Sequence, residues 1–174
     1  MKTYKLILII ILININIAYP EEFHYILDDI CINELHSSAK EFFKNTNIST
    51  FRDSRGIIIR YEIENLLSEY YHPNISNYKI LEKFLAKIEN PAIIEVHTGD
   101  FPTEAFPYLK SWEVSTVIAN NIEALITKPY GSVDQNKINS VGYGEFLPAK
   151  NTSNNGGKYL NRVDIIVLCN ISGE

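Results

Sequence analysis

The sequence lacks any cluster of lysine or arginine, and its 16 basic and 21 acidic side chains give a formal net charge of −5. Proteins that bind nucleic acid neutralise phosphates with clustered basic side chains, so we expect no nucleic-acid partner. The four histidines are scattered, and neither they nor the cysteines have the spacing of metal ligands. The sequence therefore predicts neither a metal site nor a cofactor.

Cysteine is scarce, and Cys31 and Cys169 are the only two. In an oxidising compartment they could form one disulfide bond. Two buried, unpaired thiols are the alternative, because a sequence does not place the two Cα atoms relative to each other. Both interpretations stay open at this point.

The sequence also lacks a recognisable catalytic arrangement. No Ser/His/Asp set carries an oxyanion-hole signature, and neither glycine-rich stretch fits a phosphate loop. Asp100 and Glu104 could be the carboxylate pair of a glycan hydrolase. Two acids on one proline-flanked loop are more often simply solvated, so the sequence predicts a protein that is not an enzyme.

No apolar run reaches the length of about 20 residues that a membrane-spanning helix needs. The run Leu6–Ile17 is shorter, is interrupted by two asparagines and follows a start that carries two lysines. This layout is typical of a secretory signal. We expect residues 1–18 to be removed and the mature chain to lie in the periplasm without a transmembrane span. Retention of this segment as an uncleaved anchor is the alternative.

Hydrophobic periodicity predicts one domain of alternating helices and strands after an N-terminal helix. Apolar residues at three- and four-residue steps predict helices over Glu21–Lys44, Tyr78–Ile88 and Ser111–Thr127. Runs rich in β-branched residues predict strands over Gly56–Ile63, Ala92–Val96, Lys137–Val141 and Arg162–Leu168.

The resulting order, βαβαββ, predicts a two-layer α+β fold with helices packed on one face of a mixed sheet. We expect an N-terminal helical segment and connector over residues 19–50, and the domain itself over residues 51–174.

The stretch IEVHTGDFP, residues 94–102, places a polar cluster at the end of a predicted strand. Gly99 and Asp100 are turn formers, so an ordinary turn explains them. Strand-to-helix loops also carry many binding sites, and Thr98 and Asp100 would then face a ligand.

Five features in the expected order resemble the OmpA-like domain, the peptidoglycan-binding module of outer-membrane and flagellar-motor proteins. They are IEVHT at 94–98, WEVS at 112–115, Ala119, VGYGE at 141–145 with Pro148, and NRVDI at 161–165. The spacing between the first two matches the MotB-type branch of the family better than the OmpA branch. The resemblance covers about residues 55–168. It implies the α+β fold described above and binding of the peptide stem of peptidoglycan.

In that family, an acid in the strand-end loop pairs the ammonium group of diaminopimelate, and an arginine on the following helix pairs its carboxylate. Here Gly99 takes the position of the acid, with Asp100 one place later, and Ile118 takes the position of the arginine. Ile118 continues an apolar stripe and is expected in the core. The resemblance implies a site formed by Thr98, Gly99, Asp100, Ser111, Ser115, Asn161 and Arg162.

Structural roles compete with ligand binding at several of these positions. Arg162 also suits an ion pair with Asp164 or Glu145. Ser111 suits the N-cap of a helix, and Ser115 suits helix packing.

Three aromatic residues near the expected site are given structural roles. Trp112 is expected in the core rather than as a binding platform. Tyr143 is expected to be half-buried, and His97 to be a hydrogen-bonding group at the end of a strand.

The sequence therefore predicts a non-catalytic protein of the cell envelope that binds peptidoglycan weakly, with other envelope or outer-membrane proteins as further partners. A degenerate domain that serves as a protein–protein scaffold without wall binding is the alternative.

Overall fold

The computed structural model describes residues 20–67, 72–98, 108–146 and 161–169, with side chains described from residue 29 onward. The expected signal, residues 1–18, lies outside these ranges. The described elements are α2 (Pro20–Phe43), β1 (Ser49–Asp53), β2 (Gly56–Glu62), α3 (Ile63–Leu66), α4 (Ile75–Leu85), β3 (Ala92–Thr98), α5 (Ser111–Ile126), the 3-10 helix η2 (Gln135–Lys137), β4 (Ile138–Gly144) and β5 (Asn161–Leu168).

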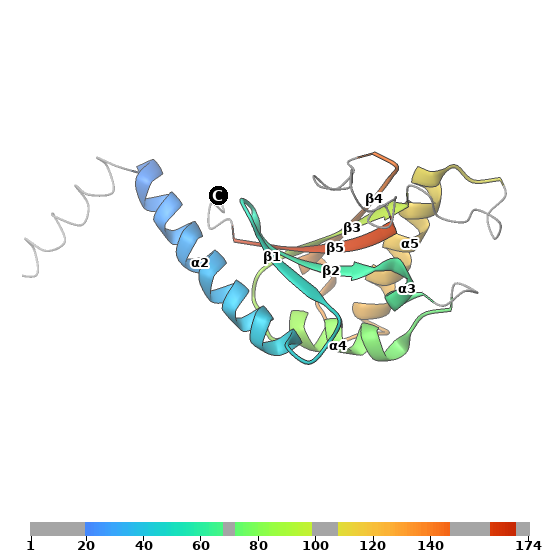
Figure 1. The fold of residues 1–174 in the computed structure, drawn as a ribbon, viewed down its shortest axis with the longest axis horizontal. Coiled ribbons are helices and arrows are strands. Elements are labelled where there is room, and N and C mark those ends of the chain that lie inside the picture. The colour runs from blue at the N-terminus through green and yellow to red at the C-terminus, as the bar shows by residue number, and fades with distance from the viewer. Residues whose placement is uncertain (1–19, 68–71, 99–107, 147–160, 170–174) are drawn as a thin grey trace, which may run out of the picture.

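The strands form one mixed sheet in the order β1-β2-β5-β3-β4. β3 and β4 are parallel, and the other neighbouring strands are antiparallel. The helices pack on one face of this sheet (Figure 1), which confirms the predicted two-layer α+β fold. The last of the described strands, β5, lies in the middle of the sheet and brings Asn161 and Arg162 beside the end of β3.

The prediction of the first strand was incomplete. Ser49 and Thr50 were expected to belong to a connector, and no element was predicted for residues 51–53, but together these residues form β1, which makes a hairpin with β2 through pairs such as Phe51 with Ile58. Its sequence, STFRD, gives no signal because most of its residues are exposed, so burial imposes no alternation. The expected boundary between residues 50 and 51 falls inside this strand.

The core lies between the sheet and the helices. Ile57 and Ile59 of β2, and Ile165 and Val167 of β5, have no exposed surface. They share one face because strand residues two apart point to the same side. Ile118 of α5 packs into this core with 4% of its surface exposed, as expected.

α2 packs against β1 and β2 and is part of the same core. Phe43 is buried, and its ring lies 5.1 Å from the ring of Phe84 in α4. Nearer the start of the helix, Cys31 forms a disulfide bond with Cys169, with a Cα–Cα distance of 5.7 Å. Of the two interpretations of the cysteines, the structure has the disulfide.

The N-terminal part of α2 extends beyond the sheet (Figure 1). Within the described ranges, α2 and the other helices are all too short or too polar to cross a membrane.

Candidate functional site

The structure brings three of the expected site residues together at one end of the sheet. Thr98 ends β3 and lies opposite Asn161, the first residue of β5. The Thr98 hydroxyl donates a hydrogen bond to the backbone oxygen of Ser111, at 2.8 Å. In return, the Ser111 hydroxyl donates to the backbone oxygen of Thr98. These two hydrogen bonds therefore link the start of α5 to the end of β3.

These hydrogen bonds correct the role expected for Ser111. The residue is not the N-cap but the first residue of α5, and the N-cap is Lys110. The backbone N–H of Lys110 donates to the Glu113 carboxylate, at 2.7 Å. An acid in the first turn also suits the positive end of the helix dipole. The hydroxyl of Ser111 is then free of the capping role and bonds to Thr98 instead.

Ser115 is packed between α5 and β4 and has no exposed surface. Its hydroxyl donates to the backbone oxygen of Trp112 at 2.9 Å and accepts from the backbone N–H of Gly144 at 2.9 Å. These contacts match the packing role that the sequence left open. Gly99 and Asp100, the loop positions of the expected site, lie outside the described residues.

Arg162 lies beside His97 in the strand register, one position after the pair formed by Thr98 and Asn161. Because side chains alternate along a strand, Arg162 points to the opposite face of the sheet from Asn161. Its Nε donates to Oδ2 of Asp164, at 3.0 Å. The ion pair expected between these two residues is therefore present, and it draws Arg162 away from the cluster at Thr98.

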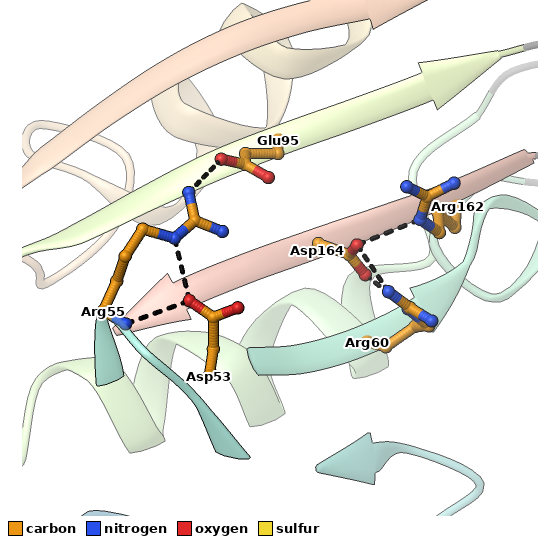
Figure 2. A network of polar contacts seen from close by, with 6 residues as sticks. All are labelled: Asp53, Arg55, Arg60, Glu95, Arg162 and Asp164. Carbon is orange, nitrogen blue, oxygen red and sulfur yellow. Dashed lines mark hydrogen bonds and ion pairs between the residues drawn. The ribbon is translucent and has the colours of Figure 1, made fainter. Parts of the chain in front are cut away.

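Asp164 is shared by two arginines. Arg60 on β2 contacts it in bidentate fashion, from Nε to Oδ1 at 2.6 Å and from Nη2 to Oδ2 at 2.8 Å. Figure 2 shows Arg60 and Arg162 reaching the carboxylate from different strands. Asp164 is 3% exposed and Arg162 is 6% exposed. Burial lowers the pKa of Arg162, and the negative charge of Asp164 opposes that effect.

A second ion-pair group lies further along the sheet. Arg55 donates from Nε to Asp53 at 2.8 Å and from Nη1 to Glu95 at 2.9 Å. The hydrogen bond to Asp53 is the largest effect raising the pKa of Arg55. Glu95 lies opposite Asp164 in the register of β3 and β5, so both groups occupy one face of the sheet (Figure 2). This is the face opposite the apolar core, because the intervening strand residues point into the core.

His97 lies next to this charged face and is 3% exposed. Its ring stacks on that of Tyr143, with centroids 5.2 Å apart. Nδ1 lies 3.4 Å from the backbone oxygen of Phe146, and Nε2 has no hydrogen-bond partner among the described residues. Burial, followed by the positive charge of Arg162, lowers the pKa of His97 to about 4. The ring is therefore neutral at neutral pH and is only partly satisfied by hydrogen bonds.

The expectation for Trp112 was wrong. This side chain is 46% exposed, whereas its neighbours on α5, Val114 and Ser115, are buried. The backbone of Trp112, rather than its ring, packs against β4: a Cβ at Gly144 would lie 2.6 Å from its nitrogen. Tyr143 is half-buried, as expected.

The charged face was not predicted, although one of its ion pairs was. Arg60 and Asp164 are 104 positions apart in the sequence, and only the antiparallel pairing of β2 with β5 places them opposite each other. The available signal was the pair of charged residues in each of two largely apolar strands, Arg60 and Glu62 in β2 and Arg162 and Asp164 in β5. Among the residues that the structure describes, no group of three histidine, cysteine, aspartate or glutamate side chains could hold a metal ion.

The fold closely resembles several solved structures, although neither a family model nor a curated protein matches the sequence. A MotB-like protein from Desulfovibrio vulgaris superposes with a TM-score of 0.68 and 19% identity, over 85% of this chain and 98% of that one.

Two further solved structures are similar to this chain in fold. The cell wall anchor of the T6SS from Pseudomonas aeruginosa gives a TM-score of 0.61 at 14% identity, over 74% of this chain and 95% of that one. The periplasmic domain of Helicobacter pylori MotB gives 0.58 at 18% identity, over 70% of this chain and 79% of that one. The resemblance to OmpA-like and MotB-type domains is thus confirmed at the level of the fold.

Proposed function

We propose that this protein is a non-catalytic module of the cell envelope that binds peptidoglycan in the periplasm. The observation that carries the proposal is the fold, which is shared with a T6SS cell wall anchor and with the periplasmic domain of MotB. The disulfide bond supports it, because disulfides persist in oxidising compartments such as the periplasm.

Binding through the peptide stem is expected to be weak. Ile118, at the position of the family's arginine, is buried in the core and offers no charge to a ligand. Arg162, the nearest alternative cation in the expected site, is engaged by Asp164. Asp100 is left as the main charged contact. One exposed charge pair contributes only about 1 kcal/mol or less. The total binding free energy is therefore expected to be small, about 4 kcal/mol, which corresponds to a dissociation constant on the order of 1 mM.

A scaffold that binds envelope proteins rather than the wall is the second candidate. The burial of Ile118 and of Ser115 favours this candidate, because two of the positions that would contact the peptide stem face the core of the protein. A glycan hydrolase that uses Asp100 and Glu104 is a third candidate, and both residues lie outside the described ranges.

Co-sedimentation with insoluble peptidoglycan separates these candidates. We expect the full chain to bind weakly and more strongly at low salt, and Asp100→Ala to bind several-fold less. Asp29→Ala on α2, which removes an exposed acid elsewhere, is the matched control and should bind like the wild type. Absence of sedimentation in every variant favours the scaffold, and release of soluble muropeptides reveals a hydrolase.

A further inference from the structure

A polar pocket lies where the connector between α2 and β1 meets α3 and α4. It has a volume of about 280 Å³. Pockets for whole small-molecule ligands usually exceed about 300 Å³, so this one suits a compact ligand. Its described lining includes four asparagines and two isoleucines: Asn45, Asn47, Asn65, Asn77, Ile48 and Ile80. None of these residues belongs to the site expected for the peptide stem, and we call the pocket that they line the asparagine pocket.

Hydrogen bonds to the backbone position both sides of the asparagine pocket. On the connector, the Thr46 hydroxyl donates to the backbone oxygen of Phe43 at 2.7 Å and accepts from the backbone N–H of Ile48 at 3.2 Å. On the other side, Nδ2 of Asn77 in α4 donates to the backbone oxygen of Asn65 in α3. The segments that carry the asparagines are therefore positioned before a ligand binds, which reduces the entropy that binding costs.

Three of the asparagines have side-chain amides that the protein itself does not use. The amides of Asn45, Asn47 and Asn65 make no hydrogen bond with any described residue. Each amide has one acceptor oxygen and two N–H donors. Such groups bond to water in solution, so a ligand that displaces the water must replace its hydrogen bonds. Hydroxyl groups meet this requirement because they both donate and accept.

The ligand should carry no charge. No charged side chain is part of the lining that the structure describes. Lys44 adjoins Asn45 in the sequence, but it is exposed and paired with Glu41. Glu64, which adjoins Asn65, is exposed as well. An ionised group that entered the pocket would lose hydration without gaining a partner of opposite charge.

The two isoleucines give the asparagine pocket an apolar side. Ile48 on the connector and Ile80 on α4 are partly buried and pack against the core. Their carbon atoms suit C–H groups of a ligand rather than its hydroxyls. A six-membered sugar ring has this division, because hydroxyls project from its edge and C–H groups lie on its faces.

We propose that the asparagine pocket binds a neutral sugar ring. The amides of Asn45, Asn47 and Asn65 bond to its hydroxyls, and Ile48 and Ile80 pack against a C–H face. The proposal does not depend on binding of the peptide stem, because the two sites share no residue.

The test is a titration of the full chain, labelled with ¹⁵N and followed through its backbone and asparagine side-chain amide signals. The neutral probes are the methyl pyranosides of glucose, galactose and mannose, and N-acetylglucosamine. Methyl glucuronide adds a carboxylate to the same ring, and cyclohexanol is a ring of the same size with one hydroxyl. We expect at least one neutral sugar to shift the side-chain signals of Asn45, Asn47 and Asn65 saturably. The last two probes should bind about fivefold more weakly or worse, because one brings an unpaired charge and the other lacks hydrogen bonds.

Three outcomes of this titration would overturn the proposal. The first is the absence of a saturable shift of these side-chain signals with all the neutral sugars. The second is binding of cyclohexanol as tight as that of the best sugar, and the third is tighter binding of the glucuronide.

Two matched variants test the amides themselves. Asn65→Ala removes one amide of the pocket but keeps the backbone oxygen that accepts from Asn77, so sugar binding should weaken about fivefold. Asn139→Ala removes an exposed amide of β4 outside the described lining and should leave binding unchanged. Equal affinity of both variants and the wild type would show that the amide does not hold the sugar. If Asn65→Ala does not fold, Asn47→Ala on the exposed connector makes the same test.

No probe contains a peptide, so the outcome is independent of the co-sedimentation experiment with Asp100→Ala. A chain that binds the sugars and not the wall would contradict the proposed function alone. A chain that binds the wall and not the sugars would contradict the sugar site alone.

Discussion

Ser115 accepts a hydrogen bond from the backbone N–H of Gly144 at 2.9 Å, which joins α5 directly to the last residue of β4. The helix can approach so closely because glycine occupies two positions of the strand. A Cβ at Gly142 would lie 2.2 Å from the backbone nitrogen of Thr116, and one at Gly144 would lie 2.6 Å from that of Trp112. Gly142 and Gly144 therefore allow the backbone of α5 to pack closely against β4.

Replacing Gly142 with alanine should push α5 away from β4. Overpacking of a close contact typically costs about 1–3 kcal/mol, and the obstacle here is backbone, so we expect a loss at the upper end of that range. Chemical denaturation measures it. Asn139→Ala changes an exposed residue of the same strand and should alter stability by less than about 0.5 kcal/mol. A Gly142→Ala variant that is as stable as the wild type would contradict the close packing of α5 on β4.

Removing Asp164 should be far more costly than removing an exposed acid. Asp164→Ala leaves two positive charges close together, and that of Arg162 is almost fully buried, which typically costs about 3–5 kcal/mol. Glu89→Ala also breaks an ion pair, with Lys137, but the Glu89 side chain is 98% exposed and its loss should change little. Similar melting temperatures for the two variants would show that the buried pairs do not stabilise the fold.

His97 should make stability depend on pH between about 6.5 and 4. Its pKa is lowered from 6.5 to about 4 on folding, so the unfolded chain binds more protons in this window. The stability that the neutral ring confers is complete above pH 6.5 and is lost as pH falls towards 4. The loss is up to about 3 kcal/mol.

The comparison that isolates this effect uses His97→Gln. Asp164, Arg162 and Arg60 are the charged groups that act on the ring, and all three remain in the variant. Denaturant melts at pH 7 and pH 4.5 should differ less for His97→Gln than for the wild type. An identical pH dependence in both proteins would show that His97 does not titrate as described.

Reduction of the disulfide should destabilise the protein. The bond between Cys31 and Cys169 closes a loop across 138 positions of sequence, and removing such a restraint typically costs about 2–4 kcal/mol. The melting temperature should fall when a reductant is added. A Cys31→Ser/Cys169→Ser variant should melt at the reduced value and be insensitive to reductant.

The division into residues 19–50 and 51–174 is still a prediction, and the contacts of α2 argue that the two parts share one core. A chain that begins at residue 51 loses Phe43, which is 2% exposed, and the start of β1. We expect it to melt well below the Cys31→Ser/Cys169→Ser variant, which lacks only the covalent link. A chain that begins at residue 45 keeps all of β1, and its melting temperature should lie between those of these two proteins. Equal stability of the three would show that residues 51–174 fold alone.

The elements that the sequence predicted well are those in which burial forces a pattern. α5 and β5 were located to within one residue at each end, because apolar residues must recur at the helical or strand period where one face is buried. β1 gave no such signal because its residues are mostly exposed and its pairing with β2 is made by the backbone.

The candidate site was predicted less well than the fold. Thr98, Ser111 and Asn161 do come together, since they lie at the ends of neighbouring elements. Arg162 was assigned to the same cluster, although alternation along β5 turns it to the other face. The partnership of Arg60 with Asp164 depends on the register between two strands far apart in the chain, which local patterns do not determine.

The position of the disulfide also determines how the protein would carry mechanical load. Cys169 directly follows β5, the middle strand of the sheet, and Cys31 lies in the first half of α2. Tension applied to the chain before Cys31 passes through a covalent bond into that middle strand. It therefore bypasses the helix segment that ends at Phe43 and does not peel β1 from the sheet edge. The domain would bear such a pull through the hydrogen-bonded pairs that β5 makes with β2 on one side and with β3 on the other.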